Sequence, residues 1–332
     1  MPVKINPILI RHLAPKNFLS FGPDYKGIDL LPLNVIIGAN GSGKSNLIEA
    51  ISFMRASLHE WRDVLRRGGG VSEWIWKGNQ DDAPASVEWI IQQLPRDKRA
   101  RPLRHQVAFR SLAQSFQIHE EVVEYQPREK EVKRRTPFYR SIDGAAVALK
   151  SEISERRRLA PGTIDMQRSI IGQRNDPEIY PQLAWLASNY KKIRIYREWS
   201  MGTKSFLRQP QPSDMRNEVI EEDFSNLGLN LSRLRQNSRA KNAIIQHLRK
   251  LDEGLTDFDV SAAGGTVQIF FNEGDFVIPA PRLAYDREFA VDSEQPFSFL
   301  IATQPDEETN WGRRLQGEIR REIQTDPPPK FS

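Results

Sequence analysis

The feature that most constrains this chain is a glycine-rich loop set between an apolar segment and an amphipathic one. The loop, residues 38–45, reads GANGSGKS and fits the pattern G-x-x-x-x-G-K-[S/T]. The apolar run 33–37 before it predicts a short buried strand. After the loop, apolar residues recur at steps of three and four, which predicts one helix from Ser45 with a single buried face: Leu47, Ile51, Met54, Leu58, Trp61 and Leu65. A strand, this loop and a helix in that order are the setting in which the pattern holds phosphate.

The residue types in this loop suit a bound phosphate chain. Glycines let the backbone curl so that successive N–H groups point inward, and the N-terminus of the helix adds partial positive charge. Lys44 would reach the β- and γ-phosphates of a nucleotide, and the Ser45 hydroxyl would ligate Mg²⁺. An ordinary glycine turn that happens to end in Lys-Ser is the alternative. The expected cofactor-binding residues are Gly38, Asn40, Gly41, Ser42, Gly43, Lys44, Ser45 and Asn46.

Residues 1–142 are expected to form an N-terminal lobe around this loop. Short strands are predicted at 7–10 and 18–21, and the glycines at 68–70 can supply a left-handed cap for the long helix. From residue 71 onward, apolar and polar residues alternate between proline breakers, which is typical of an antiparallel β subdomain. Trp74 and Trp76 are two residues apart, so they are expected to share one face of a strand and to serve core or dimer packing.

The remainder divides into three stretches by composition. Residues 143–255 predict a helical insertion or lobe, with its last two helices at 225–236 and 239–251. Residues 256–283 predict a β-hairpin that returns to the core, with Ala263-Gly264-Gly265 as a turn before it. Residues 284–332 are polar and end in three prolines before Lys330, which predicts a divergent and poorly ordered tail.

Composition excludes several other classes of protein. Among 332 residues, 48 Lys and Arg face 43 Asp and Glu, for a net charge of +5. The absence of cysteine excludes disulfides, thiol nucleophiles and cysteine zinc sites, and the five histidines are scattered. No apolar run approaches the ~20 residues of a membrane-spanning helix. These features predict a soluble, cytoplasmic protein that has no membrane partner.

The residues around the loop carry a family resemblance. Residues 16–21 (KNFLSF), 33–38 (LNVIIG) and 43–50 (GKSNLIEA) resemble the start of ABC-type ATPases of the RecF/SMC group, and more narrowly the bacterial AAA-family ATPases near RecF. The likeness continues through about the first 283 residues, with RGGGV at 67–71 and DFSNL at 223–227. The resemblance implies an α/β P-loop NTPase fold, ATP and Mg²⁺ as cofactors, a homodimer that closes around two nucleotides, and work on DNA. Because Leu19 stands where relatives often carry a basic residue, adenine contacts do not carry over.

The C-terminal part of such an ATPase core is not recognisable. The family would continue after Arg282-Leu283 with a signature segment, a strand ending in Asp-Glu, and a switch histidine. The nearest candidate for that strand is 297–302, yet Asp306 and Glu307 follow only after Pro305. We therefore expect the tail to supply no parallel neighbour for the loop strand, and no catalytic carboxylate is assigned. Gln173 is a candidate for the glutamine that senses Mg²⁺ in ABC-type heads, although lone glutamines are common.

Two main functional hypotheses remain open. The first is an ATPase that dimerises on ATP and acts in DNA repair, recombination or defence against foreign DNA. The second is a truncated or split nucleotide-binding module without independent hydrolysis, completed by a second chain. A small-molecule kinase is disfavoured because residues 46–50 read like the SMC group. Four basic clusters, at 96–101, 130–135, 156–158 and 191–194, could contact DNA phosphates or could be solvated surface.

Overall fold

The computed structural model describes residues 9–31, 33–78, 83–92, 101–126, 137–143, 145–149, 164–165, 167–197, 206, 208–280 and 299–302. The chain forms two compact units, the first comprising 1–191 with 296–332 and the second 192–295. The boundaries therefore differ from those expected from composition. The insertion predicted at 143–255 is shared between the two units, and the hairpin predicted to return to the core belongs to the second unit.

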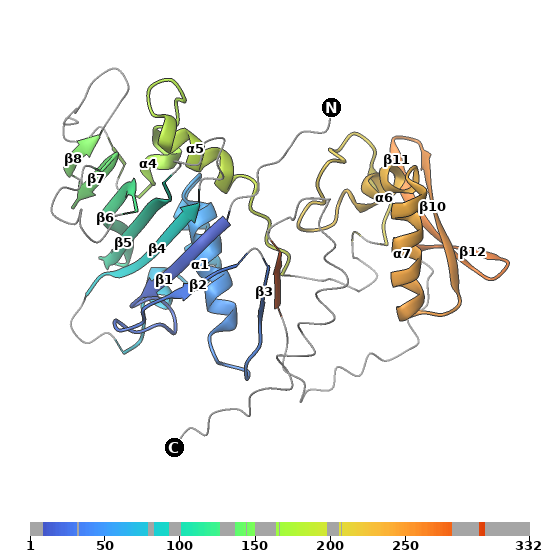
Figure 1. Cartoon of the computed structure of the whole chain (residues 1–332), viewed down its shortest axis with the longest axis horizontal. Coiled ribbons are helices and arrows are strands. Elements are labelled where there is room, and N and C mark those ends of the chain that lie inside the picture. Colours follow the sequence, from blue (N-terminus) through green and yellow to red (C-terminus); the bar gives the residue numbers. More distant parts are fainter. Residues whose placement is uncertain are drawn as a thin grey trace. The chain divides into compact units, whose positions relative to one another are not determined.

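The first unit is built on a seven-stranded sheet in which all neighbouring strands are antiparallel (Figure 1). Its order is β2-β1-β4-β5-β6-β7-β8. The strands are β1 (Leu9–Lys16), β2 (Ile28–Asp29), β4 (Ala85–Gln92), β5 (Leu103–Leu112), β6 (Ser115–Tyr125), β7 (Tyr139–Ile142) and β8 (Ala145–Leu149). This confirms the antiparallel β subdomain. It also corrects the helical expectation for the residues after 143, because 145–149 form a strand.

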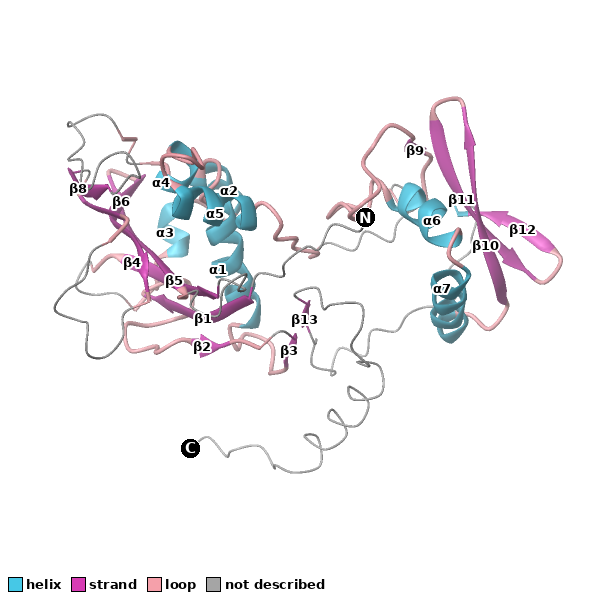
Figure 2. Cartoon of the chain, turned by 45° about the horizontal axis from the view of Figure 1, so that its top comes forward, coloured by secondary structure: helices cyan, strands magenta, loops and turns pink. Residues whose placement is uncertain are grey.

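Helices of the first unit gather on one side of this sheet (Figure 2). They are α1 (Lys44–Ala56), α2 (Trp61–Arg67), α3 (Val71–Trp74), α4 (Ile170–Gln173) and α5 (Pro181–Tyr190). Their buried faces meet alternate strand residues in an aromatic core. Phe53 on α1 lies at the centre, with its ring 5.7 Å from Phe18, 6.3 Å from Trp89 and 5.1 Å from Phe109.

The helix after the loop ends earlier than its apolar stripe predicts. α1 stops at Ala56 and α2 begins at Trp61. Trp61 folds back so that its ring stacks 5.0 Å from that of Phe53 and its indole N–H donates to the Phe53 carbonyl at 2.8 Å. In one continuous helix these two residues would be about 12 Å apart along the axis, so the break is what allows the stack. The predicted left-handed glycine cap is confirmed at Gly69 (φ 91°), but it follows α2 and not one long helix.

Two further local predictions are wrong. The predicted strand at 18–21 is a tight turn in which Phe18 and Phe21 exchange backbone hydrogen bonds of 3.0 and 2.9 Å. Trp74 ends the short helix α3 rather than lying on a strand, so it does not share a strand face with Trp76. Its core role is confirmed, because Trp74 is buried 5.6 Å from Phe18.

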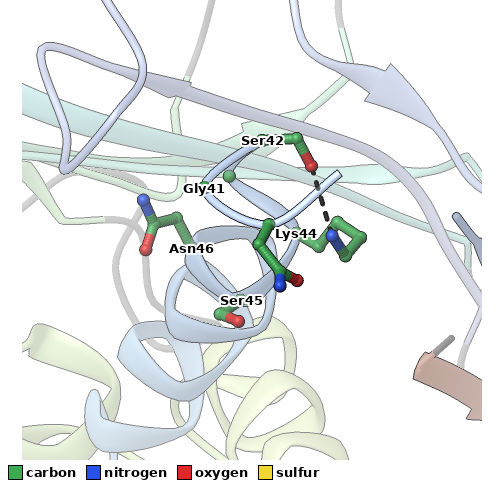
Figure 3. Close-up of a pocket in the computed structure, with 7 residues that line it drawn as sticks. Gly41, Ser42, Lys44, Ser45 and Asn46 are labelled. Atoms are coloured by element: carbon green, nitrogen blue, oxygen red, sulfur yellow. Dashed lines mark hydrogen bonds between the residues drawn. The ribbon is translucent and has the colours of Figure 1, made fainter. Parts of the chain in front are cut away.

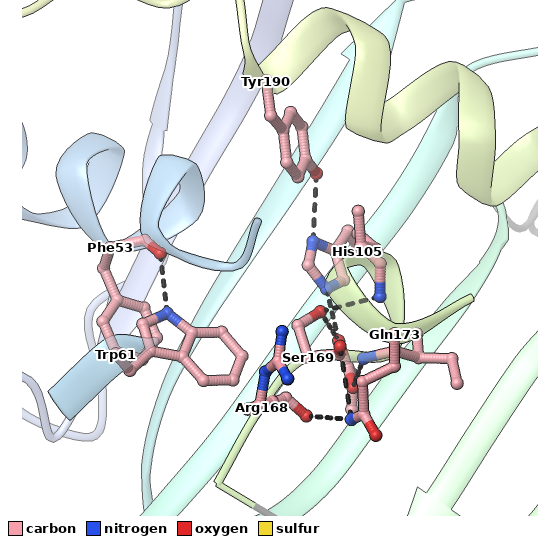
Figure 4. Close-up of polar contacts among 10 residues, drawn as sticks. Phe53, Trp61, His105, Arg168, Ser169, Gln173 and Tyr190 are labelled. Carbon is pink, nitrogen blue, oxygen red and sulfur yellow. Dashed lines mark hydrogen bonds and ion pairs between the residues drawn. The ribbon is translucent and has the colours of Figure 1, made fainter. Parts of the chain in front are cut away.

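A buried polar cluster fastens α4 and α5 to the sheet (Figure 4). The His105 ring lies between Tyr190 on α5, 3.0 Å from its hydroxyl, and Glu121 on β6, 3.1 Å from its carboxylate. Glu121 also accepts from the Ser169 hydroxyl and, at 3.0 Å, from the backbone N–H of Ile170. Burial, together with the nearby Glu121 carboxylate, raises the pKa of the Tyr190 phenol well above its usual value.

The strand before the glycine loop lies outside the large sheet. β3 (Leu33–Ile36) confirms the predicted strand and pairs antiparallel with β13 (Phe299–Ala302). β13 is the segment considered above as a candidate strand of the ATPase core. It is antiparallel, whereas a parallel neighbour is what that role requires. The predicted burial of the loop strand is wrong, since Val35 is 43% and Ile37 is 60% exposed. The rest of the tail lies outside the described residues.

The second unit is a small sheet covered by two helices. Its strands are ordered β10 (Leu255–Ala263), β11 (Thr266–Glu273) and β12 (Phe276–Pro279), and β9 (Gln211–Pro212) pairs with β11. The helices are α6 (Leu227–Arg235) and α7 (Ser238–Leu251). Both predicted helices and the hairpin are confirmed, whereas β10 was missed. The predicted turn is confirmed, because Gly264 and Gly265 have φ of 57° and 79° between β10 and β11.

Candidate phosphate-binding site

The glycine loop encloses a pocket at the N-terminus of α1 (Figure 3). The pocket has a volume of about 210 Å³ and is lined by the continuous segment 40–46. Gly41 (φ 81°) and Gly43 (φ 88°) both adopt the left-handed backbone conformation, and Gly43 is the N-cap of the helix. The first turn of α1 holds no acidic residue. The positive end of the helix dipole therefore faces the pocket without a neutralising carboxylate in that turn.

Three of the glycines are required for different reasons. A Cβ at Gly38 would lie 2.9 Å from the Ser42 hydroxyl oxygen, so Ser42 packs too closely against Gly38 to leave room for a side chain. A Cβ at Gly41 would meet nothing within 4 Å, so only its positive φ favours glycine. Gly43 combines both demands, because its Cβ would lie 2.8 Å from the hydroxyl oxygen of Ser20.

Lys44 is the one charged residue among those that line the pocket. Its side chain is buried and its ammonium group donates to the carbonyl oxygens of Gly38 at 2.5 Å and Ala39 at 2.7 Å. A third contact reaches the Ser42 hydroxyl at 3.4 Å (Figure 3). All three acceptors are neutral. These acceptors hold the ammonium group in place but do not compensate its positive charge. A buried cation of this kind is suited to an anionic ligand.

A turn near the N-terminus supports the loop from the side. Ser20 accepts a hydrogen bond of 2.8 Å from the Asn46 side-chain amide in the first turns of α1. The Phe21 ring lies 3.7 Å from the Cβ position of Gly43 and packs 4.6 Å from Tyr25. No pattern in the sequence predicted this role for residues 20–25. The resemblance of residues 16–21 to the family was the signal that could have located them.

The remaining candidates lie elsewhere or outside the described residues. Gln173 uses its amide within its own loop, donating to the Arg168 carbonyl at 2.8 Å and accepting from the Asp165 N–H at 2.9 Å (Figure 4). Its neighbour Gly172 packs on the Ser57 carbonyl at the far end of α1, about 18 Å along the helix from the loop. The Mg²⁺-sensing role for Gln173 is therefore wrong.

Two basic clusters, 130–135 and 156–158, lie outside the described residues, and so does the cluster at 96–101 except for Arg101. In the described part of the chain, no group of three or more His, Asp or Glu side chains could hold a metal ion. Nor does any described helix combine the length and apolar character needed to cross a membrane.

The strand β3, the glycine loop and the helix α1 define a P-loop NTPase fold. Residues 33–107 match the family model of an AAA domain described as "putative AbiEii toxin, Type IV TA system". Over 71 residues the chain is 42% identical to the DNA double-strand break repair Rad50 ATPase of Sulfurisphaera tokodaii, a match covering 19% of this chain and 8% of that protein. Residues 33–107 are thus similar to AAA P-loop ATPase domains, and the Rad50 match supports the SMC/RecF-like resemblance that the motifs predicted.

One solved structure is also similar to this chain. It comes from work on the structural biochemistry of ATP-driven dimerization and DNA-stimulated activation of SMC ATPases. The sequences are 24% identical, and the TM-score is 0.27 over 39% of this chain and 72% of that one. This chain spans less than a tenth of the Rad50 protein, so that protein's activity as a whole is not transferred by the match.

Proposed function

We propose that this chain binds Mg·ATP at the glycine loop and acts as a Rad50/SMC-type ATPase that pairs with a second copy on ATP and works on DNA. The observation that carries the ATP site is the buried Lys44, held by neutral oxygens in a left-handed glycine loop. The backbone N–H groups of 40–45 would surround the phosphates, with Lys44 on the β- and γ-phosphates. Ser45, exposed in the first turn of α1, would hold Mg²⁺, which neutralises phosphate charge.

Titration with a fluorescent ATP analogue in the presence of Mg²⁺ tests this site. Lys44→Ala removes a charge-assisted contact and should weaken binding by on the order of 2 kcal/mol or more, which is about 30-fold. The matched control is Lys77→Ala, since Lys77 is exposed and its partners among the described residues belong to α3, with Glu73 at 2.9 Å. Circular dichroism of both variants checks that they fold. Equal affinity of wild type and Lys44→Ala would refute the site.

A second candidate function is nucleotide binding without independent turnover. The residues that line the pocket include no Asp or Glu, and the described neighbour of β3 is antiparallel. A P-loop ATPase needs a carboxylate for Mg²⁺, a group that activates water, and donors that stabilise the developing charge on the γ-phosphate. Without them we expect phosphate release near the uncatalysed rate. Turnover near ~1 s⁻¹ that Lys44→Ala abolishes would establish hydrolysis and exclude this candidate.

A further inference from the structure

The two helices of the second unit carry a concentration of positive charge that is separate from the four basic clusters described above. Residues 227–251 contain six Arg and Lys residues and no Asp or Glu, so this stretch alone carries +6 when the whole chain carries +5. The six cations are Arg233, Arg235, Arg239, Lys241, Arg249 and Lys250. An acid-free run of 25 residues in a chain with 43 acidic residues is the signal that could have located it.

Helix α7 separates its apolar and basic residues onto opposite sides. Ile244, Ile245 and Leu248 pack against the core residues Phe258, Val260 and Val267 of β10 and β11. The opposite side of α7 is exposed and carries Arg239, Asn242, Ala243, Gln246, His247, Arg249 and Lys250. Arg239, Gln246 and Lys250 are spaced by seven and four residues, so they follow one line along the helix for about 16 Å.

Among the described residues, carboxylates neutralise two of the six cations. Lys241 pairs with Asp257 at 2.7 Å, and Arg235 pairs with Asp259. Arg233 and Arg249 donate to backbone carbonyls, at 2.8 Å to Asn217 and 3.1 Å to Leu255. Carbonyl oxygens orient these guanidinium groups without cancelling their charge.

The remaining two cations, Arg239 and Lys250, have no partner among the described residues. Four exposed cations therefore stay uncompensated, and we call Arg233, Arg239, Arg249 and Lys250 the α6–α7 basic face.

Helix stability explains only part of this arrangement. Arg249 and Lys250 lie in the last turn of α7, where cations interact favourably with the helix dipole. Arg239 lies in the first turn, which contains no acidic residue and where a cation is unfavourable. The described residues therefore give no structural reason for a positive charge at that position, whereas a bound polyanion does.

We propose that the α6–α7 basic face binds the phosphodiester backbone of a nucleic acid. The inference rests on the proposed DNA partner and adds where on this chain the contact is made. The α7 cations from Arg239 to Lys250 extend over about 16 Å, which matches a repeating anion because this length spans about five phosphates of one strand at 3.4 Å each. A site for a single small anion would instead have hydrogen-bond donors that point toward one position.

Binding of fluorescent 20-nucleotide single-stranded and duplex DNA, measured by anisotropy from low to physiological salt, tests the proposal. The test variant is Arg239→Gln with Lys250→Gln. The matched control is Arg62→Gln with Arg66→Gln, which removes the same charge from exposed positions on α2 in the first unit. The test variant should weaken binding on the order of tenfold and lower the slope of log affinity against log salt by about 2. The DNA affinity of the control should remain within about threefold of wild type. The charge-conserving variant Arg239→Lys with Lys250→Arg should bind DNA as wild type does.

Three outcomes would overturn the proposal: no DNA binding by the wild type at low salt, an unchanged salt slope in the test variant, or equal losses in test and control. Mg·ATP titration of the same proteins keeps this result separate from the nucleotide site. ATP affinity should be unchanged in all of them. If the wild type binds Mg·ATP but no DNA, the proposed DNA partner fails together with the basic face, whereas the ATP site stands. If the wild type binds DNA and the test variant binds it equally well, only the basic face fails. Whether duplex or single-stranded DNA binds more tightly identifies the source of the phosphates.

Discussion

Replacing Gly43 by alanine should disturb the glycine loop in two separable ways. The backbone there has φ of 88°, and holding alanine in the left-handed region costs about 1–2 kcal/mol. The new Cβ would also lie 2.8 Å from the Ser20 hydroxyl oxygen, a separation at which one of the two groups must move. Gly41→Ala is the matched comparison, because Gly41 has a similar φ of 81° and its Cβ would meet nothing within 4 Å.

Urea unfolding and Mg·ATP titration of the same variants separate the two costs. Gly41→Ala should lower the free energy of unfolding by about 1–2 kcal/mol, and Gly43→Ala should lower it by more. Adding Ser20→Ala to Gly43→Ala should recover the difference, although alone it costs about 0.5–1.5 kcal/mol through the lost hydrogen bond from Asn46. ATP affinity should follow the same order. Equal losses for Gly41→Ala and Gly43→Ala, with no coupling to Ser20, would refute this explanation of the loop.

Two further predictions concern the first unit. Trp61→Phe keeps an aromatic ring on Phe53 but leaves the buried Phe53 carbonyl without the indole N–H, so urea unfolding should show a loss of about 1–3 kcal/mol. Tyr190 has its pKa raised by burial and by Glu121, so above pH ~10 the unfolded chain loses a proton that the folded chain keeps. Stability should therefore be full below that pH and fall above it, less steeply in Tyr190→Phe. Tyr139, whose pKa burial also raises, is present in both proteins and contributes equally to each. If the free energy of unfolding fell equally steeply with pH in wild type and in Tyr190→Phe, the prediction would be contradicted.

Elements whose pattern is local were predicted well. The helices α6 and α7 and the hairpin of β11 and β12 follow from apolar periodicity and from turn residues within a few positions of each other. The strand predicted at 18–21 shows the limit of local pattern, because two aromatic residues in a short apolar run do not distinguish a strand from a turn. The break after α1 was missed because its cause, the return of Trp61 onto Phe53, depends on the folded position of the ring.

The sequence by itself determined the candidate nucleotide site, since residues 38–46 are contiguous and glycine conformation with one lysine sets their chemistry. Tertiary structure alone decided which strands became neighbours, as when β1 pairs with β4 across some seventy residues and β3 meets β13 antiparallel. It also decided which cations have a carboxylate partner: Lys241 on α7 pairs with Asp257 on β10, whereas Arg239 on the same helix meets no carboxylate among the described residues. Such pairings depend on distances between residues far apart in the chain, which local propensity and spacing do not encode.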